Sequence, residues 1–466
     1  MRTIVASALF ASVALVPSSS AATLKVPSQF ATIQAAVTAA VSGDTVLVAK
    51  GTYFENVTIA TAGITLKGSG ANTIIDARPD PNVGTGAAVR IVAADVTVTN
   101  LRIRHAAPNG FMVLGVEDGN IDIGTASNVT LSKLTSEHPY AYHVRTSNSD
   151  GLTLDRCTFK FGGRVSIDGD GVTVSKCSFR MLELALSIDG SSATITGNKF
   201  EHCPIAILSG GDDTSIKSNS ITNATLFAIF HGGANGEISS NTIKNGTGIF
   251  IPGGSTLLVS KNKLSTIGVS PNTTSLVSPG AGIFVDGVTG ITIEKNSISD
   301  CSVPGMWLLD CANAELTQNT ITRAGLRTAS VIFGGGPSIP QARGAGIYLQ
   351  NGTGHSIVSN KLSSCVHDGI LVEADGVLID GNQSSSHGED GIEVNGNGSS
   401  VSDNVMKSNL GEGLDLSGNG ITVSGNTMSG NRVDWRNSGA LGATSGNSPA
   451  APDSTDLEIE YDAPPN

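Results

Sequence analysis

The sequence has few aromatic and few charged side chains. Aromatic residues make up 4% of its 466 residues and charged residues 15%, whereas glycine occurs 57 times. An ordinary globular domain carries about 25% charged residues, so this composition favours a repetitive β architecture. The formal net charge is −12 and the sequence has no basic cluster, which argues against nucleic acid or an anionic membrane as the main partner.

Long apolar runs are absent after the N-terminus, so we expect no membrane span. The first 22 residues, by contrast, combine Arg2, an apolar stretch at 4–16 and a small-residue end, "SSSAA". This pattern is typical of a secretory signal peptide cleaved after Ala21 or Ala22; the alternative is an uncleaved anchor. We therefore predict an extracytoplasmic protein, either periplasmic, secreted or on the cell surface.

A short motif recurs through most of the chain. Segments such as "ITGNKF", "IKSNSI" and "VSGNTM" place ten asparagines in register, 21 to 23 residues apart where nothing is inserted. Each repeat holds an alternating strand before the asparagine, an apolar residue two positions after it, and a second strand of the form Gly-Ile-x-Val. The ten asparagines are Asn198, Asn219, Asn241, Asn262, Asn296, Asn319, Asn360, Asn382, Asn404 and Asn426.

The length of the repeat determines the predicted fold. A repeat this short cannot bury its own apolar face, so successive repeats must stack and share one core. Because every repeat contains strands and no helix, we predict an all-β parallel β-helix, a solenoid in which each coil adds about 4.8 Å. Its asparagines are expected to form an inward, purely structural ladder, bonded to one another and to the backbone.

The repeat resembles the right-handed parallel β-helix of the pectin-lyase-like superfamily. The opening "FATIQAAVTAAVSGDTVLVAKGTYFENVTI" is similar to the N-terminal segment of many secreted members. The resemblance implies a capping helix at 32–41, and the helical spacing of Ile33, Ala36 and Val37 agrees with it. We therefore predict a signal peptide (1–22), a right-handed β-helix (23–437) and an acidic, disordered tail (438–466).

The six cysteines are unevenly placed, and none has a Cys/His spacing typical of a zinc site. Cys157 and Cys177 occupy the ladder position on adjacent coils, where either a disulfide or two stacked thiols would fit. Cys203, Cys301 and Cys365 share another column but belong to distant coils, so they cannot pair with one another.

Three coils carry insertions, at roughly 106–118, 267–281 and 324–345, all at the corner before the Gly-Ile-x-Val strand. Loops stacked on one corner would form a wall beside a flat strand face, and so a groove. The resemblance to pectin-lyase-like enzymes implies the same location, because their polysaccharide groove lies on the strand that corresponds to Gly-Ile-x-Val, beside the corner that carries the insertions here. The outward positions of the Gly-Ile-x-Val strand are therefore the candidate binding surface.

Alternation of side chains along this strand predicts two outward columns. The first contains Ser166, Ser187, Ile207, Ile229, Phe250, Phe284, Trp307, Tyr348, Leu371, Glu393 and Asp415. The second contains Arg145, Asp168, Asp189, Ser209, His231, Pro252, Asp286, Leu309, Gln350, Glu373 and Asn395. We predict that the four consecutive aromatics Phe250, Phe284, Trp307 and Tyr348 form an exposed strip that stacks on sugar rings. The alternative is that the insertions fold over them as a second core.

A catalytic site on this surface needs paired acids, or an acid with a base. The candidates, from three successive coils, are Asp189, Asp212, Asp213 and His231, which resemble an incomplete polygalacturonase set because the expected Arg-x-Lys is missing. Carboxyl groups one or two coils apart would fit inverting hydrolysis, which uses a separation of about 6.5–9.5 Å. The alternative is that the aspartates lie in solvated turns and the histidine is unrelated.

A lyase would need a basic residue beside a calcium-neutralised uronate. Lys160 and Arg180 share one column, with Glu137 and Glu201 on either side of them. A surface ladder of alternating charges would produce the same column. The Gln-Asp and Asp-Phe-Ile-Phe-Gly-type stretches of pectin methylesterases are absent from the sequence.

Acidic residues gather in the C-terminal coils, before and on the Gly-Ile-x-Val strand. They are Asp368, Asp390, Glu412, Glu373, Glu393 and Asp415. Like charges about 4.8 Å apart repel one another unless a cation or raised pKa values relieve them. Hard oxygen ligands suit Ca²⁺, so we predict at least one weak calcium site here and no other cofactor.

Two function classes remain open. The first is a secreted hydrolase or lyase that acts on a polysaccharide along the groove. The second is a non-catalytic surface or matrix protein that uses the β-helix as a rigid binding rod. The incomplete catalytic set favours the second class, and the three insertions favour the first. In either case we expect a monomer whose partner is a polysaccharide.

Overall fold

The computed structural model describes residues 20–77, 87–104, 119–139, 141–268, 280–326 and 344–449. Most of the predicted signal peptide, most of each predicted insertion and the predicted tail from residue 450 onward lie outside these ranges. In the described part of the chain, no helix is long and apolar enough to cross a membrane.

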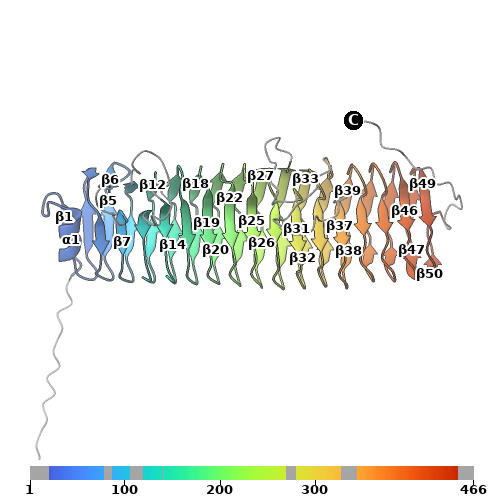
Figure 1. Cartoon of the computed structure of the whole chain (residues 1–466), viewed down its shortest axis with the longest axis horizontal. Helices are drawn as coiled ribbons and strands as arrows, with labels where there is room; N and C mark the ends of the chain where they lie inside the picture. The colour runs from blue at the N-terminus through green and yellow to red at the C-terminus, as the bar shows by residue number, and fades with distance from the viewer. Residues whose placement is uncertain are drawn as a thin grey trace, which may run out of the picture.

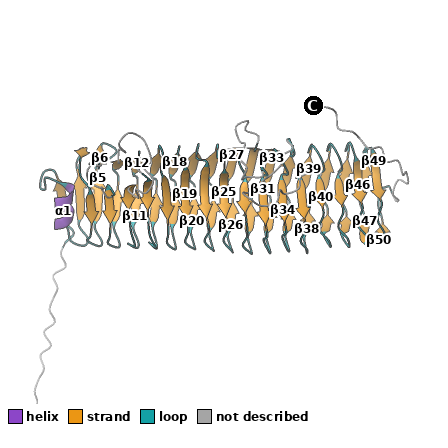
Figure 2. Ribbon diagram, in the orientation of Figure 1, coloured by secondary structure: helices purple, strands orange, loops and turns teal. Residues whose placement is uncertain are grey.

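The described residues form a long parallel β-helix with three strands in almost every coil (Figures 1 and 2). Sheet A has 18 strands, and sheets B and C have 16 each. Neighbours within sheets B and C lie three strands apart in chain order and pair in parallel, as one coil per repeat requires. The predicted all-β solenoid is confirmed.

Sheet C contains the Gly-Ile-x-Val strands and therefore the candidate binding surface. Its strands are β4 (Val57–Ile59), β7 (Val89–Ile91), β10 (Gly119–Asp122), β13 (Tyr142–Arg145), β16 (Arg164–Ile167), β19 (Leu184–Ile188), β22 (Ile205–Ser209), β25 (Phe227–His231), β28 (Ile249–Ile251), β31 (Ile283–Asp286), β34 (Met306–Leu309), β37 (Ile347–Gln350), β40 (Ile370–Val372), β43 (Ile392–Val394), β46 (Glu412–Leu416) and β49 (Val433–Asn437). One strand per coil gives this sheet a face as long as the solenoid (Figure 1).

Alternating side chains build the core. In β20 (Thr194–Thr196) of sheet A, Ile195 is buried between two partly exposed threonines. On sheet B, Phe159, Phe179 and Phe200 occupy one inward position on successive coils, and their ring centroids are 5.1 and 4.6 Å apart. Stacking therefore places like residues on like residues, which gives each coil a core of the same width.

A short helix lies at the N-terminal end of the solenoid (Figure 1). α1 (Ile33–Ala39) begins after Thr32, whose side chain accepts a hydrogen bond from the Ala35 amide (3.1 Å). Its buried residues Ile33, Ala36 and Val37 are those whose spacing predicted it. The predicted cap is confirmed, with slightly narrower bounds than 32–41.

The asparagine ladder is present. Asn319 donates from Nδ2 to the Ile293 carbonyl (2.8 Å) and to Asn360 Oδ1 (3.0 Å), and its Oδ1 accepts from the Asn296 amide (2.9 Å). Equivalent bonds between neighbours link all ten predicted asparagines and continue to Asn447.

The β-helix extends beyond its predicted C-terminal boundary. β50 (Leu441–Ser445) pairs in parallel with β47 (Ile421–Ser424), and Asn447 continues the ladder. The boundary at 437 is therefore wrong, because one more repeat follows it with a weaker apolar pattern: four of the five residues of β50 are exposed.

All six cysteines are buried free thiols. The Cys157 amide donates to the Cys177 sulfur (3.4 Å), so the two thiols replace asparagines in the ladder. The hydrogen bond to Cys177, together with burial, raises the pKa of the Cys157 thiol. Of the two alternatives, stacked thiols are present and a disulfide is not.

Candidate functional site: the outer face of sheet C

One column of outward side chains runs along sheet C. In strand register it contains Arg145, Ser166, Ser187, Leu208, Phe230, Phe250, Phe284, Trp307, Tyr348, Leu371, Glu393 and Asp415. The predictions of Ile207 and Ile229 in this column are wrong, because both are fully buried core residues. Ser187 pairs with Leu208, and Leu208 pairs with Phe230, so the outward positions lie one residue after the predicted isoleucines, and a difference of one residue moves a side chain to the opposite face.

The predicted aromatic strip is buried. Trp307 exposes 0% of its surface, Phe284 1%, Tyr348 4% and Phe250 8%. Ring centroids are 4.9 Å apart between Phe284 and Trp307 and 5.9 Å apart between Trp307 and Tyr348. The prediction of an exposed strip is wrong, because these rings pack on one another and on smaller apolar residues, which removes large apolar areas from water.

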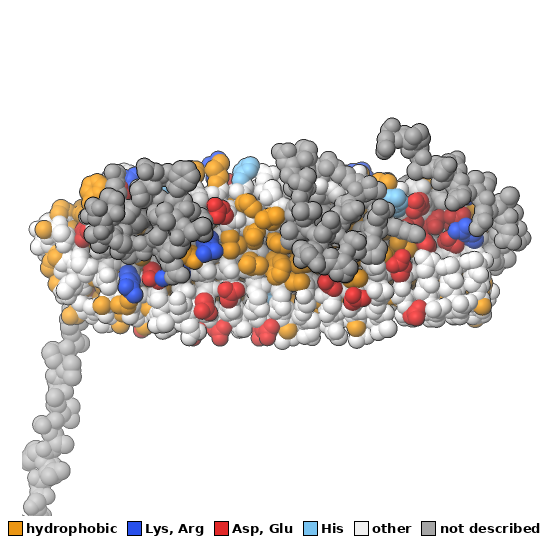
Figure 3. Space-filling view, viewed as in Figure 1, with side chains coloured by type: hydrophobic (Ala, Val, Ile, Leu, Met, Phe, Trp, Pro, Cys, Tyr) orange, Lys and Arg blue, Asp and Glu red, His pale blue; other side chains and the backbone are white. Residues whose placement is uncertain are grey.

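The aromatics form a second hydrophobic core outside the solenoid's own. Its buried members are Phe250, Ala281, Phe284, Val303, Trp307, Ala345, Tyr348 and Leu371. Only its margin is partly exposed, at Phe227, Phe230 and Leu309. Hydrophobic side chains accordingly appear in the middle of this face, between charged regions toward either end (Figure 3).

The four predicted catalytic residues are divided between the core and the surface. His231 is in register with Ser209, is fully buried, and has no hydrogen-bond partner on either ring nitrogen among the described residues. Burial lowers the pKa of His231 to about 4. Asp189, Asp212 and Asp213 are exposed and lie outside the strands. The histidine therefore belongs to the core, while the aspartates belong to the surface.

Asp212 has a structural role instead. Its Oδ1 accepts a hydrogen bond from the Ala234 amide of the next coil (2.7 Å), as Asp170 Oδ1 accepts from the Ser191 amide (2.7 Å). Such carboxylates satisfy amides in successive turns. These aspartate-to-amide hydrogen bonds between successive turns agree with the alternative interpretation, in which the aspartates are turn residues.

The basic residues considered for a lyase lie on sheet B. Lys160 and Arg180 are in register with Glu137 and Glu201, and Lys160 pairs with Glu137 (3.1 Å). This column is a surface ladder with two basic residues between two acidic ones. It belongs to a different sheet from the acidic residues of the C-terminal coils.

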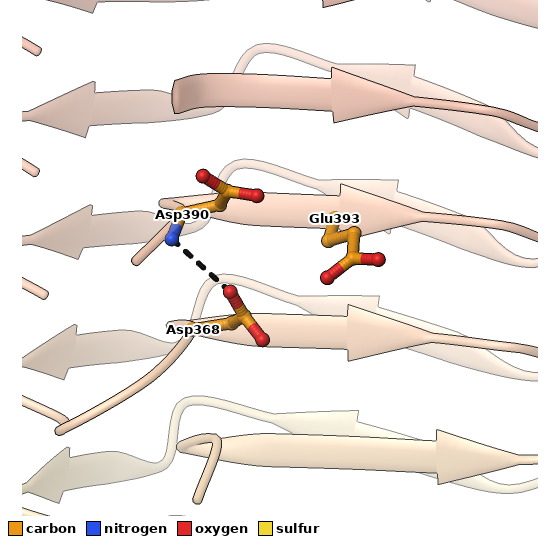
Figure 4. Close-up of side chains that lie close together, drawn as sticks. All are labelled: Asp368, Asp390 and Glu393. Carbon is orange, nitrogen blue, oxygen red and sulfur yellow. Dashed lines mark hydrogen bonds between the residues drawn. The ribbon is translucent and has the colours of Figure 1, made fainter. Parts of the chain in front are cut away.

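The acidic residues meet on the outer side of β40, β43 and β46. The Asp390 amide donates to Asp368 Oδ1 (3.1 Å), and the Glu412 amide donates to Asp390 Oδ1 (2.6 Å). Figure 4 shows the first of these bonds, with Glu393 extending from the strand of Asp390 toward the coil of Asp368. Asp415 is in register with Glu393 one coil further on. The acidic site consists of Asp368, Asp390, Glu393, Glu412 and Asp415.

Two groups of three carboxylates overlap in the acidic site. Asp368, Asp390 and Glu393 form one, and Asp390, Glu412 and Asp415 form the other, each with ligand oxygens within 4.8 Å of one another. Five of the six predicted residues therefore come together. The sixth, Glu373, is exposed and accepts a hydrogen bond from the Tyr348 hydroxyl, so its place in the predicted site is not supported by this geometry.

The electrostatics of the acidic site centre on Asp390. Burial, a hydrogen bond with Glu412 and the nearby charges of Asp368 and Glu412 raise the pKa of Asp390 far above its usual range. A positive charge comes from Arg436, whose Nε lies 3.1 Å from Asp415 Oδ1. The hydrogen bonds with Asp415 raise the pKa of Arg436 as well.

Sequence reasoning did not find Arg436. It lies on β49, in register with Asp415, one coil beyond the last predicted outward residue. Extending the outward column by one repeat identifies it. Acidic and basic side chains lie close together at this end of the face (Figure 3).

The oxygen spacing is compatible with one shared divalent cation. Two oxygens on opposite sides of Ca²⁺ lie about 4.6–5.2 Å apart, since each Ca–O bond is about 2.3–2.6 Å. Carboxylate oxygens within 4.8 Å of one another can therefore share one Ca²⁺ with little movement.

A comparison with known protein families gives one match. The family described as "Right handed beta helix region" matches residues 184–339 and 281–451. The chain belongs to this family. No curated protein sequence matches this right-handed β-helix protein significantly.

Solved structures with similar folds include enzymes and binding proteins. The Dettilon tailspike protein is 14% identical over 91% of this chain and 68% of its own, with a TM-score of 0.36. A PL6 alginate lyase in complex with a trisaccharide is 13% identical over 73% of this chain and 85% of its own (TM-score 0.44). PfbA, a surface adhesin of Streptococcus pneumoniae, is 13% identical over 84% and 87% (TM-score 0.35). These likenesses concern the fold alone.

Proposed function

We propose that this protein is an extracytoplasmic polysaccharide-binding β-helix whose acidic site holds Ca²⁺ and binds an acidic glycan through the ion. The observation that carries the proposal is the overlap of two carboxylate triads, with Asp390 in both. Buried carboxylates this close are tolerated only when protons or a cation neutralise them. Calcium takes six to eight oxygens, so three carboxylates leave coordination positions for glycan oxygens.

The shape of sheet C suits a polymer. Its strands repeat at about 4.8 Å along one face, which resembles the advance of an extended glycan by one sugar residue per coil. The half-buried rings of Phe227 and Phe230 lie on the same face and offer a limited apolar contact. The glycan would therefore run along the solenoid, with its acidic groups at the calcium site.

Binding measurements with and without calcium test this proposal. Titration calorimetry of the metal-free protein is expected to show Ca²⁺ binding, and acidic polysaccharides such as alginate or polygalacturonate are expected to bind only with Ca²⁺ present. Asp390→Asn is expected to lose both effects, and Glu373→Gln is the matched control outside the triads. Absence of calcium heat, together with an unchanged melting temperature, would contradict the proposal.

A second candidate function is glycoside hydrolysis at the same site. The raised pKa of Asp390 keeps a protonated carboxyl next to Asp415, which Arg436 pairs as a carboxylate. A proton donor beside a charged carboxylate is the pairing that glycosidases use. Release of reducing ends from a polysaccharide panel, lost in Asp390→Asn, would support hydrolysis. Unsaturated uronate absorbance in the same assay would indicate a lyase. If neither signal appears, the protein binds the polysaccharide without cleaving it.

A further inference from the structure

The outer face of sheet A carries a ladder of threonines. The eight N-terminal strands of this sheet each place a threonine at the same outward position, in direct register from coil to coil. The strands are β1 (Thr23–Val26), β2 (Thr45–Val48), β5 (Thr65–Gly68), β8 (Thr97–Thr99), β11 (Thr130–Ser132), β14 (Thr153–Asp155), β17 (Thr173–Ser175) and β20. The threonine ladder consists of Thr23, Thr45, Thr65, Thr97, Thr130, Thr153, Thr173 and Thr194.

The hydroxyls of this ladder form no hydrogen bonds within the part of the chain that the structure describes. Among the described residues, none of the eight side chains forms a hydrogen bond, and all eight are partly or fully exposed. The parallel column two residues further on behaves differently. There, Ser132 donates to Thr99 (2.8 Å) and Ser175 donates to Asp155 (3.1 Å). The threonine ladder thus presents unpaired donors and acceptors, while the next column pairs with itself.

Strand propensity alone does not explain the ladder. Threonine favours outward strand positions, and this preference acts equally on every strand of sheet A. Yet the same register position beyond β20 holds mixed residues. They are Ser215, Glu237, Leu258, Thr292, Glu315, Ser356 and Leu378. The ladder is therefore a local feature of the N-terminal half.

We propose that the threonine ladder binds an uncharged, extended polysaccharide that lies along the solenoid axis, one sugar residue per rung. A hydroxyl both donates and accepts, so it matches the hydroxyls of a sugar, and the threonine methyl can contact a pyranose C–H. The ladder itself is uncharged, which favours a neutral glycan over the acidic one proposed for sheet C. Rungs about 4.8 Å apart resemble the advance of a ribbon-like glycan per residue.

The rigid threonine ladder allows several weak hydroxyl contacts to a glycan to form together. A single hydroxyl contact in water contributes little, because water competes for the same hydrogen bonds. On a rigid ladder the second and later contacts form within one complex and need no further ordering of the protein. Several rungs together can therefore retain a polymer that a single threonine cannot, and short oligosaccharides are expected to bind poorly.

Isosteric substitutions test the ladder. The triple variant Thr130→Val, Thr153→Val and Thr173→Val keeps shape and strand propensity but removes three hydroxyls. The matched control is Thr158→Val, Thr242→Val and Thr320→Val, three outward threonines of sheet B. The probe is microcrystalline cellulose, with chelator present so that the acidic site cannot contribute. We expect at least tenfold weaker retention of the ladder variant, an unchanged control, and recovery when the three positions carry serine.

Three results would overturn the proposal. They are no retention of the unmodified protein on cellulose, equal loss in the sheet B control, and serine variants as weak as the valine variants. Inhibition of ice recrystallisation without cellulose binding would also overturn it, since the ladder would then order water and not sugar. Because chelator silences the calcium site, failure here is independent of failure at the acidic site.

Discussion

The Tyr348 hydroxyl donates a 2.6 Å hydrogen bond to Glu373 Oε2. Tyr348 is a member of the buried aromatic core, and Glu373 directly follows β40, the strand that begins two residues after Asp368. The bond links the second core to the first coil of the acidic site. Glu373 therefore contributes to packing, and the acidic site proper begins at Asp368.

Trp307→Ala is expected to destabilise the protein by about 3–5 kcal/mol, because it leaves a cavity where a fully buried indole was. Phe54→Ala is the control, since Phe54 is 67% exposed and its loss is expected to cost less than about 0.5 kcal/mol. Chemical denaturation measures both. A loss for Trp307→Ala as small as the control's would contradict burial of the aromatic core.

Asp390→Asn is expected to stabilise the calcium-free protein at neutral pH, by on the order of 2 kcal/mol. The amide keeps the acceptor for the Glu412 amide and folds without taking up a proton, whereas burial and the acidic neighbours force the Asp390 carboxyl to be protonated on folding. The melting temperature of the variant should not rise with Ca²⁺. The free energy of unfolding of the unmodified protein should rise by about 2.7 kcal/mol when the Ca²⁺ concentration is a hundred times its Kd. Thermal melts with Ca²⁺ and with chelator distinguish the two effects.

Arg436→Gln is expected to make stability depend more strongly on calcium. The substitution removes the positive partner of Asp415 and leaves that carboxylate beside Asp390 and Glu412. Because the arginine is half exposed, we expect a loss of only about 1–2 kcal/mol in chelator. Added Ca²⁺ should restore most of it. An equal loss with and without calcium would indicate that Arg436 acts only through packing.

Stability is expected to fall as the pH drops from about 6.5 to about 4. Burial lowers the pKa of His143 to about 3 and the pKa values of His231 and His387 to about 4, against 6.5 for an ordinary histidine. Between these values only the unfolded chain takes up the protons, so protonation favours unfolding, and stability is fully present only above 6.5. Each histidine contributes about 2 kcal/mol to the loss at pH 5.

His231→Leu isolates one of these contributions. His231 has no hydrogen bond to lose among the described residues, so the substitution removes the titration and little else. The difference in unfolding free energy between pH 7.5 and pH 5 should shrink by about 2 kcal/mol. His202→Gln is the exposed control and should leave the difference unchanged.

Asn319→Ala is expected to cost about 2–4 kcal/mol, because it removes a central rung and leaves the Asn296 amide and the Ile293 carbonyl without their partner. Asn447→Ala should cost less, since Asn447 is the last observed rung and has a ladder neighbour on one side only. Equal losses at both positions would show that neighbouring rungs do not reinforce one another.

The sequence by itself determined the solenoid, its asparagine ladder and its capping helix. Each follows from a local rule: a period of 21 to 23 residues, a polar residue that must be satisfied when buried, and the helical spacing of Ile33, Ala36 and Val37. The clustering of acidic residues in the C-terminal coils could also be predicted from the sequence, because residues one period apart must lie on neighbouring coils.

Only the tertiary structure decided what becomes of the outward side chains. The repeat gives the direction of Trp307 relative to the solenoid but not whether other residues pack over it, and packing buried the ring. Ile207 and Ile229 likewise lie in the core, because strand pairing gives the outward positions to Leu208 and Phe230 and side chains alternate with a period of two. The ion pair of Arg436 with Asp415 was also decided by the structure, because the repeat places the two residues on neighbouring coils but does not specify the side-chain conformations that bring their charges together.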